Sequence, residues 1–181
     1  MRLLERISGS VLWLLEDNAG ARQNLQREAQ ARRIDPERLI FAPRMKLDQH
    51  LARHRCADLF LDTLPYNAHT TASDALWAGL PVATCPGGTF AGRVAGSLLR
   101  SVGLPELIAQ SLEEYEALAL QFARDHRALK ELRAKLMDNT LSAPLFNTDR
   151  FRRNVEAAYS AMQEIRLRGE NPRTFVVNAF N

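Results

Sequence analysis

The sequence predicts an α/β protein built as a Rossmann-like, three-layer parallel sheet. Four short apolar runs, at residues 10–15, 39–41, 57–61 and 81–84, have the length and composition of strands buried on both faces. Segments rich in helix-forming residues separate these runs, and the connecting loops are short. Strands that alternate with helices in this way pair in parallel through right-handed crossovers.

Each apolar run is followed by a segment of helical composition. The expected helices span residues 21–33, 47–55, 71–77 and 90–101. Gly79 is placed to end the third of them, because glycine readily adopts the left-handed conformation that closes many helices.

The last third of the chain changes character. Residues 111–137 and 149–168 have the composition of two long helical segments, and residues 142–147 form a turn between them. We therefore expect one lobe over residues 1–168, with its C-terminal helices starting at about residue 111. For the tail, residues 169–181, the sequence leaves two alternatives open: it is disordered, or it packs across the surface.

Composition and charge argue against several classes of protein. The chain has 181 residues, enough for one domain, and its formal net charge of +3 suits an anionic small ligand. Its basic residues are scattered without interleaved aromatic residues, so nucleic-acid binding is not indicated. No apolar run reaches the roughly 18 residues of a membrane span, and the first residues do not resemble a secretory signal. Two cysteines, Cys56 and Cys85, make no disulfide framework, so we expect a cytoplasmic protein.

Polar residues follow the third apolar run, at the sheet edge where open α/β folds bind their ligands. His69, Thr70 and Thr71 stand at the expected start of a helix, where free N–H groups and the helix dipole attract phosphate. The hydroxyl groups and the imidazole add hydrogen-bond donors, and Asp74 can accept from ribose hydroxyls. Taken alone, the pattern favours a simpler role, in which Thr70 or Thr71 only caps the helix.

Two other loops reach the same edge. Residues 86–89, Pro-Gly-Gly-Thr, follow the fourth run, and glycines let a backbone approach a ligand closely. After the second run come Met45 and His50, with Arg53 three residues further on. An imidazole at this position can stack on a base or bond a ribose hydroxyl.

Metal and nucleophilic chemistry have little support. His50 and His54 would share a helix face as a metal pair does, but no third ligand is suitably spaced. There is no Gly-x-Ser-x-Gly elbow, no Walker-type loop, and no Gly-x-Gly-x-x-Gly after the first strand. Cys85 ends a predicted buried strand, which favours a structural thiol.

Several motifs occur in one order along the chain. They are Asp62-Thr63, Asn67-Ala-His-Thr-Thr71, Asp74-Ala-Leu-Trp-Ala-Gly-Leu-Pro81 and Ser142-Ala-Pro-Leu-Phe-Asn147, preceded by the strand at residues 10–15. In this combination the chain resembles the C-terminal catalytic lobe of O-GlcNAc transferase and its bacterial SPINDLY-like relatives. The resemblance runs from about residue 1 to about residue 168.

The resemblance implies a fold and a function. Members of this family carry tetratricopeptide repeats followed by two Rossmann-like lobes in the GT-B arrangement, and the donor, typically UDP-GlcNAc, lies against the C-terminal lobe. No metal ion or other cofactor is implied, since the helix dipole and hydroxyls stabilise the leaving diphosphate. The residues implied are His69, Thr70 and Thr71 at the diphosphate, Asp74 at the ribose, His50 and Arg53 around the uridine, and the backbone of Met45 at the base.

The chain also departs from the family pattern. A lysine usual after the second strand aligns near Leu47, and Lys46 is displaced by one residue. By the resemblance, the repeats, the N-terminal catalytic lobe and the first strand and loop of this lobe would belong to another part of the enzyme. We therefore expect donor binding, and no transferase activity from this chain alone, because half a cleft cannot exclude water or orient an acceptor hydroxyl.

Three alternatives remain open at this point. The donor could be GDP-fucose, as for some SPINDLY-type relatives. The chain could instead be a non-catalytic interaction module, whose C-terminal helices would support a homodimer through their apolar faces. RNA binding is the third alternative, and only the basic isoelectric point of the chain supports it.

Overall fold

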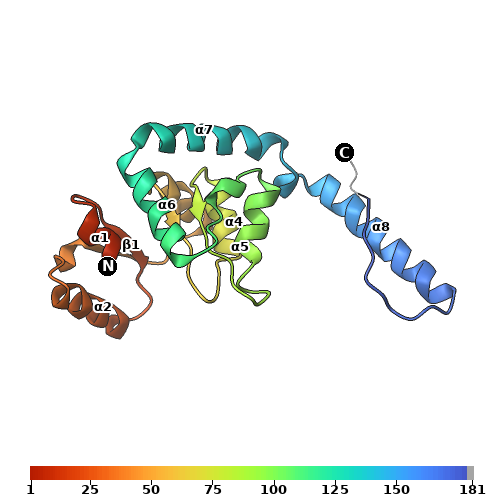
Figure 1. Ribbon diagram of the computed structural model, residues 1–181, viewed down its shortest axis with the longest axis horizontal. Coiled ribbons are helices and arrows are strands. Elements are labelled where there is room, and N and C mark those ends of the chain that lie inside the picture. The colour runs from red at the N-terminus through yellow and green to blue at the C-terminus, as the bar shows by residue number, and fades with distance from the viewer. Residues whose placement is uncertain (179–181) are drawn as a thin grey trace.

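Strands and helices alternate along most of the chain (Figure 1). The computed structural model describes residues 1–178; the end of the predicted tail, residues 179–181, lies outside the described residues. The strands are β1 (Leu12–Leu15), β2 (Leu39–Ala42), β3 (Phe60–Leu61) and β4 (Val82–Ala83). The α-helices are α1 (Arg2–Arg6), α2 (Ala19–Ala31), α3 (Leu47–Arg53), α4 (Thr70–Trp77), α5 (Val94–Ser101), α6 (Leu112–Arg124), α7 (His126–Ser142) and α8 (Thr148–Leu167). Single 3₁₀ turns lie at Pro36–Arg38, His54–Cys56, Pro105–Leu107 and Pro144–Phe146.

The strands pair in parallel, as predicted, but in two separate pairs. β1 pairs with β2, Leu12 opposite Leu39, and β3 pairs with β4, Phe60 opposite Val82. A parallel bridge from Thr84 to Ile108 extends the second pair. Among the described residues no backbone hydrogen bond joins the two pairs, so the expected continuous sheet is interrupted.

Helices cover both faces of the first strand pair. Leu39 packs with Leu4 of α1 and Ala29 of α2, which places these two helices on one face. Side chains alternate along a strand, so Trp13 lies on the other face, where the Arg53 guanidinium of α3 stands 5.7 Å from its ring centre. The sheet therefore lies between two helical layers.

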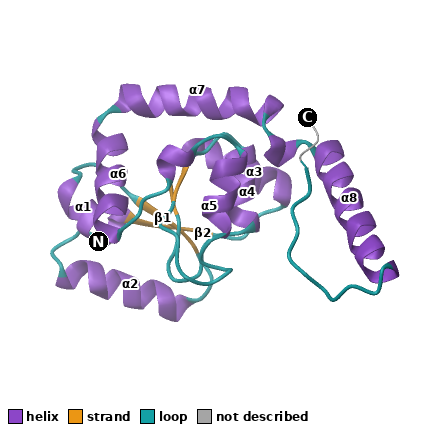
Figure 2. Ribbon diagram, turned by 45° about the vertical axis from the view of Figure 1, so that its right-hand side comes forward, coloured by secondary structure: helices purple, strands orange, loops and turns teal. Residues whose placement is uncertain are grey.

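The main core surrounds the second strand pair. Val82 of β4 is fully buried among Leu76 of α4, Leu99 of α5 and Leu136 of α7. Figure 2 shows the helices of this part gathered around the strands. This core positions α4, whose first turn carries the predicted phosphate-binding residues.

Several boundaries follow local signals in the sequence. Asn18 accepts a hydrogen bond from the Ala21 N–H at 2.7 Å and begins α2. Gly79 follows α4 with φ +81°, as its predicted role requires. Within the helical stretch expected at residues 111–137, Asp125 accepts from Ala128 N–H at 2.9 Å, and this cap separates α6 from α7.

One predicted helix is too long at its start. The helix expected at residues 90–101 begins only at Val94. Residues 86–93 instead form a closed loop, because Gly87 N–H donates to Gly92 O at 2.6 Å and Gly92 N–H donates to Thr89 Oγ1 at 3.0 Å. The short helix α1 was not predicted.

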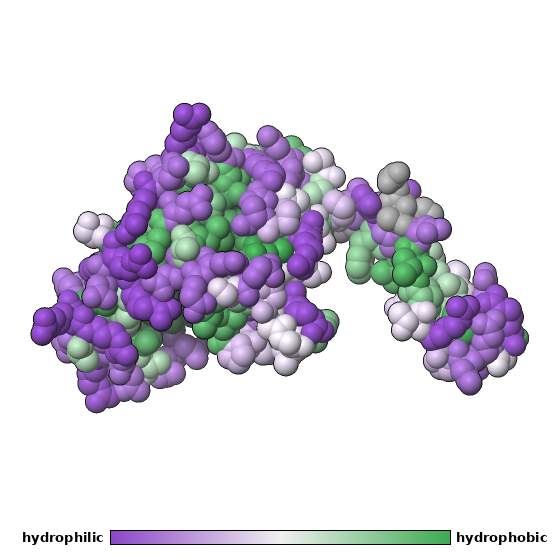
Figure 3. Space-filling view, viewed as in Figure 1, coloured by the Kyte–Doolittle hydropathy of each residue, from purple (hydrophilic) through white to green (hydrophobic). Residues whose placement is uncertain are grey.

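The C-terminal helix α8 extends away from the main body (Figure 1). Its side chains Phe151, Tyr159 and Met162 are exposed. Residues 170–178 have no regular structure and run back toward the start of α8, with apolar side chains at the surface there (Figures 2 and 3). No helix within residues 1–178 has the length and hydropathy to cross a membrane.

Leu99 provides a test of the main core. Leu99→Ala removes a side chain that is 0% exposed, and we expect it to lower the free energy of unfolding by about 2–5 kcal/mol in urea denaturation. Leu141→Ala, at a side chain that is 92% exposed, should change it by less than about 0.5 kcal/mol. Equal effects of the two substitutions would contradict this packing.

Candidate functional site

The predicted site residues lie in loops and helix starts that follow the strands. β2 leads to Met45 and α3, β3 leads to His69 and α4, and β4 leads to the loop at residues 84–93. Because the strands within each pair are parallel, the loops after β3 and β4 leave the same edge.

Asp62, at the end of β3, organises this edge. Its Oδ1 accepts hydrogen bonds from the N–H groups of Thr63 at 2.9 Å and Ala68 at 2.6 Å, and its Oδ2 accepts from Thr84 Oγ1 at 2.6 Å. Its backbone carbonyl accepts from the Tyr115 hydroxyl at 2.9 Å. Burial raises the pKa of the Asp62 carboxyl, against the lowering effect of these hydrogen bonds. Asp62 belongs to a motif of the sequence, but its role in joining these segments was not predicted.

Asn67 fixes the loop from within. It is fully buried, its N–H donates to Ala91 O at 3.1 Å, and its side-chain amide donates to Thr63 O at 2.9 Å. Its Oδ1 has no hydrogen-bond partner in the described part of the chain. The loop before α4 and the loop after β4 are therefore held together.

Helix α4 begins without a side-chain cap. His69 is its N-cap residue and makes no capping hydrogen bond, while Thr70 and Thr71 are exposed in the first turn. The simpler alternative, in which a threonine only caps the helix, is therefore wrong. The N–H groups at the start of a helix have no partner within the helix, and the exposed hydroxyl groups of Thr70 and Thr71 stand beside them.

The His69 ring is fixed beside this helix start. Its Nε2 donates to Ala91 O at 3.3 Å, and the ring stacks on Tyr66 with 4.9 Å between centroids. Phe90 meets it edge-on at 6.2 Å. Both aromatic side chains are exposed, so His69 lies in an open aromatic surface.

Helix α3 supplies the second predicted cluster. Arg53 donates to His50 Nδ1 from Nε at 3.1 Å and from Nη2 at 2.8 Å, and to Pro43 O at 2.8 Å. Because Nδ1 accepts, His50 carries its proton on Nε2. Burial, the nearby His54 and Arg53 together lower the pKa of His50, while the Asp74 carboxylate of α4 opposes them.

The structure brings His50 and Arg53 into direct contact. Asp74 of α4 acts on His50 only electrostatically, and its effect is the smallest of those on the pKa of His50. Met45 lies in the exposed loop before α3. His54 is buried, and its Nδ1 donates to the His50 carbonyl at 2.7 Å, which gives it a structural role.

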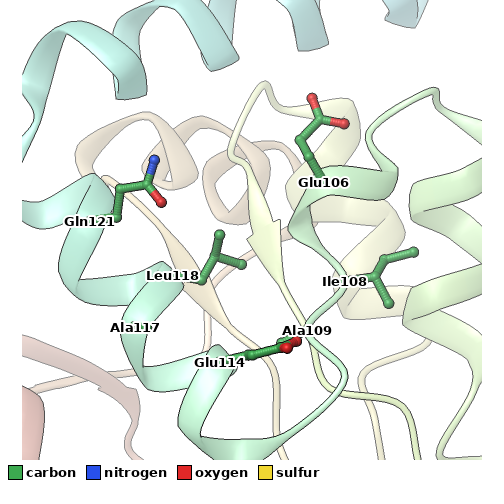
Figure 4. A pocket seen from close by; sticks show the side chains of 7 residues that line it. All are labelled: Glu106, Ile108, Ala109, Glu114, Ala117, Leu118 and Gln121. Carbon is green, nitrogen blue, oxygen red and sulfur yellow. The ribbon is translucent and has the colours of Figure 1, made fainter.

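Two hollows of the surface lie away from the predicted site residues. One of about 280 Å³ lies between α6 and residues 106–109 (Figure 4). Another of about 290 Å³ lies at residues 140–149. Neither includes a predicted site residue. Among residues 1–178 no three histidine, cysteine or carboxylate side chains are grouped to hold a metal ion.

Comparison with known proteins assigns the family. Residues 1–155 match glycosyl transferase family 41.

The chain belongs to this family.

Among relatives of this family 41 chain is the probable UDP-N-acetylglucosamine–peptide N-acetylglucosaminyltransferase SEC of Arabidopsis thaliana. The two are 38% identical over 176 residues, 97% of this chain and 18% of the relative. The UDP-N-acetylglucosamine–peptide N-acetylglucosaminyltransferase of Caenorhabditis elegans is 34% identical over 86% of this chain and 14% of its own length. The chain thus spans less than a fifth of these relatives.

A solved structure confirms the predicted fold class. A mutant O-GlcNAc transferase of Thermobaculum terrenum superposes with a TM-score of 0.78 at 34% identity, over 89% of this chain and 32% of that one. The family 41 chain is therefore a Rossmann-like lobe of a GT-B glycosyltransferase, and the resemblance to O-GlcNAc transferase and SPINDLY-like proteins is confirmed.

The contact between Arg53 and His50 predicts a titration. Nuclear magnetic resonance of the histidine ring protons should give His50 a midpoint below 6.5, and Arg53→Gln should raise it, because a positive charge is removed. Arg55→Gln, which exchanges an exposed arginine two residues further on, should leave the midpoint unchanged. A His50 midpoint that does not respond to Arg53→Gln would rule out this contact in solution.

Proposed function

We propose that this family 41 lobe binds the nucleotide-sugar donor of a protein O-linked glycosyltransferase, with UDP-GlcNAc as the donor. The observation that carries the proposal is the uncapped start of α4, with the exposed hydroxyl groups of Thr70 and Thr71 beside His69. The names of the relatives, which are UDP-N-acetylglucosamine–peptide N-acetylglucosaminyltransferases, support the choice of donor.

The diphosphate would bind at the first turn of α4. Backbone N–H groups at a helix start have no partner within the helix, and the helix dipole adds a partial positive charge. The two threonine hydroxyls donate as well. His69 Nε2 already donates to a carbonyl, so its Nδ1 is the ring atom that remains for the ligand, as a donor once the ring is protonated.

The nucleoside would extend from α4 toward α3. Asp74 accepts from ribose hydroxyls, and the Nε2–H of neutral His50 donates to the nucleoside. The Arg53 guanidinium holds His50 in this tautomer, and the backbone of Met45 reaches the base. This arrangement separates the anionic end of the donor from its uncharged end.

Sugar transfer needs a second protein surface that closes the cleft over the donor. The predicted site residues line neither of the two hollows described above, and the chain spans a minor part of each relative. The lobe therefore binds the donor without transferring its sugar, and the N-terminal catalytic lobe, the repeats and the protein acceptor complete the parent reaction.

Calorimetric titration with UDP tests the site. We expect saturable binding that the double substitution His69→Ala/Thr70→Ala weakens at least about tenfold, since each hydrogen bond to a charged group contributes about 1.5–3 kcal/mol. The pair His126→Ala/Thr140→Ala, remote from the edge, is the matched control and should bind as the unmodified chain does. Tighter binding of GDP than of UDP would contradict the choice of donor, and no binding of either at millimolar concentration would contradict the donor site.

The same titration tests independence of metal ions. Because helix N–H groups and hydroxyls take up the diphosphate charge, the UDP affinity should agree within about twofold between buffer with EDTA and buffer with Mg²⁺. A Mg²⁺-dependent gain of tenfold or more would show that the diphosphate needs a cation here.

A further inference from the structure

The hollow between α6 and residues 106–109 includes none of the predicted site residues, and the proposed function does not use it (Figure 4). Its volume is about 280 Å³. Pockets for drug-sized ligands span about 300–1,000 Å³, so this hollow has room for one side chain rather than for a nucleotide. Four of the residues that line it are apolar: Ile108, Ala109, Ala117 and Leu118.

Two exposed carboxylates lie at the rim of this hollow. Glu106 and Glu114 are at opposite ends of it, with Leu118 between them (Figure 4). Glu106 is paired with Lys135 at 2.5 Å. Glu114 pairs with no basic side chain within residues 1–178: its Oε2 accepts from the Gln110 N–H at 2.7 Å, and its Oε1 has no hydrogen-bond partner there. A carboxylate with a fixed orientation and one free oxygen therefore stands beside an apolar surface.

Both walls of the hollow are fixed to the same buried residue. On the α6 wall, Tyr115 follows Glu114, and its hydroxyl donates to the Asp62 carbonyl at 2.9 Å. On the other wall, the Ala109 N–H donates to Thr84 O at 2.9 Å, and Thr84 Oγ1 donates to Asp62 Oδ2 at 2.6 Å. The hollow is therefore preformed, and a side chain that enters it has little of the protein to order.

The sheet edge beside the hollow is closed to another strand. The parallel bridge from Thr84 to Ile108 directs the N–H and C=O of Ile108 away from β4. That N–H donates to Pro105 O at 3.1 Å, and that C=O accepts from Gln110 Nε2 at 3.3 Å. Because both backbone groups of this edge residue are used, a partner has to be held by a side chain rather than by strand addition.

We propose that this hollow binds one arginine side chain, carried by a flexible segment of a partner protein. The aliphatic stem of the arginine packs against Ala109, Ala117 and Leu118, and its guanidinium donates to Glu114 Oε1. The side-chain oxygen of Gln121, which also lines the hollow, accepts a second N–H. Arginine fits better than lysine, because its planar group presents several N–H donors at once.

Nuclear magnetic resonance with a blocked pentapeptide, Gly-Leu-Arg-Leu-Gly, tests the site. We expect the peptide at millimolar concentration to shift the methyl resonances of Ala109, Ala117 and Leu118 in a saturable way. The same peptide with citrulline in place of arginine has nearly the same shape and no charge. It should bind at least about tenfold more weakly, because a hydrogen bond between charged groups is lost. Equal binding of the two peptides would overturn the proposal.

Two chain variants supply a matched control. Glu114→Gln keeps an oxygen that can accept from the Gln110 N–H but removes the charge, and should weaken binding of the arginine peptide at least about tenfold. Glu113→Gln, at a neighbouring exposed residue that does not line the hollow, should bind as the unmodified chain does.

Four outcomes contradict the proposal. It is overturned if the arginine peptide shifts none of these resonances at millimolar concentration, or if Glu114→Gln binds as tightly as the unmodified chain. It is also overturned if free arginine binds as tightly as the peptide, which would make the hollow a site for a small cation. Shifts of the same resonances with rising protein concentration alone would make a second copy of the chain the occupant.

Discussion

The buried carboxylate of Asp62 is the interaction on which the geometry of the ligand edge depends. Its oxygens accept hydrogen bonds from the N–H groups of Thr63 and Ala68 and from the hydroxyl of Thr84. The backbone carbonyl of Asp62 accepts one from the Tyr115 hydroxyl. Hydrogen bonds to a charged group contribute about 1.5–3 kcal/mol each and offset part of the cost of burying the carboxylate, and burial remains the larger effect because the pKa of Asp62 is raised. Strands β3 and β4, helix α6 and the start of α4 are thereby held in one arrangement.

Much of the fold could be predicted because its signals are local. Asn18, Gly79 and the apolar runs act through neighbouring residues, and the elements they mark are present. The position of His69 and Thr70 at the start of a helix could be predicted for the same reason, because a helix start is set by the residues around it. The role of Asp62 could not be predicted, because its partners Thr84 and Tyr115 lie 22 and 53 residues away in the chain.

Errors in the predicted boundaries have the same physical origin. The residues on both sides of Asp125 are helix formers, so the sequence does not indicate a boundary there. The Asp125 side chain nevertheless caps the start of α7, and α6 ends just before it. The loop at residues 86–93 depends on the approach of Gly87 and Gly92, where a Cβ on Gly92 would stand 3.1 Å from Gly87 Cα. Composition alone does not show whether a glycine serves a turn, a helix end or so close a backbone contact. The interruption of the sheet is also a property of the assembled strands rather than of any one segment.

The ligand edge and the interrupted sheet are two aspects of one topology. Crossovers on opposite faces of a sheet run in opposite directions, and open α/β sheets bind ligands beyond the carboxyl ends of the strands where this direction reverses. α4 is the helix that follows β3, so its uncapped N-terminus lies at the carboxyl end of that strand. α3 lies over the face of Trp13 and carries His50 in contact with Arg53. The start of α4 and the His50–Arg53 pair of α3 thus follow strands β3 and β2, and the order of the strands decides where each of them lies.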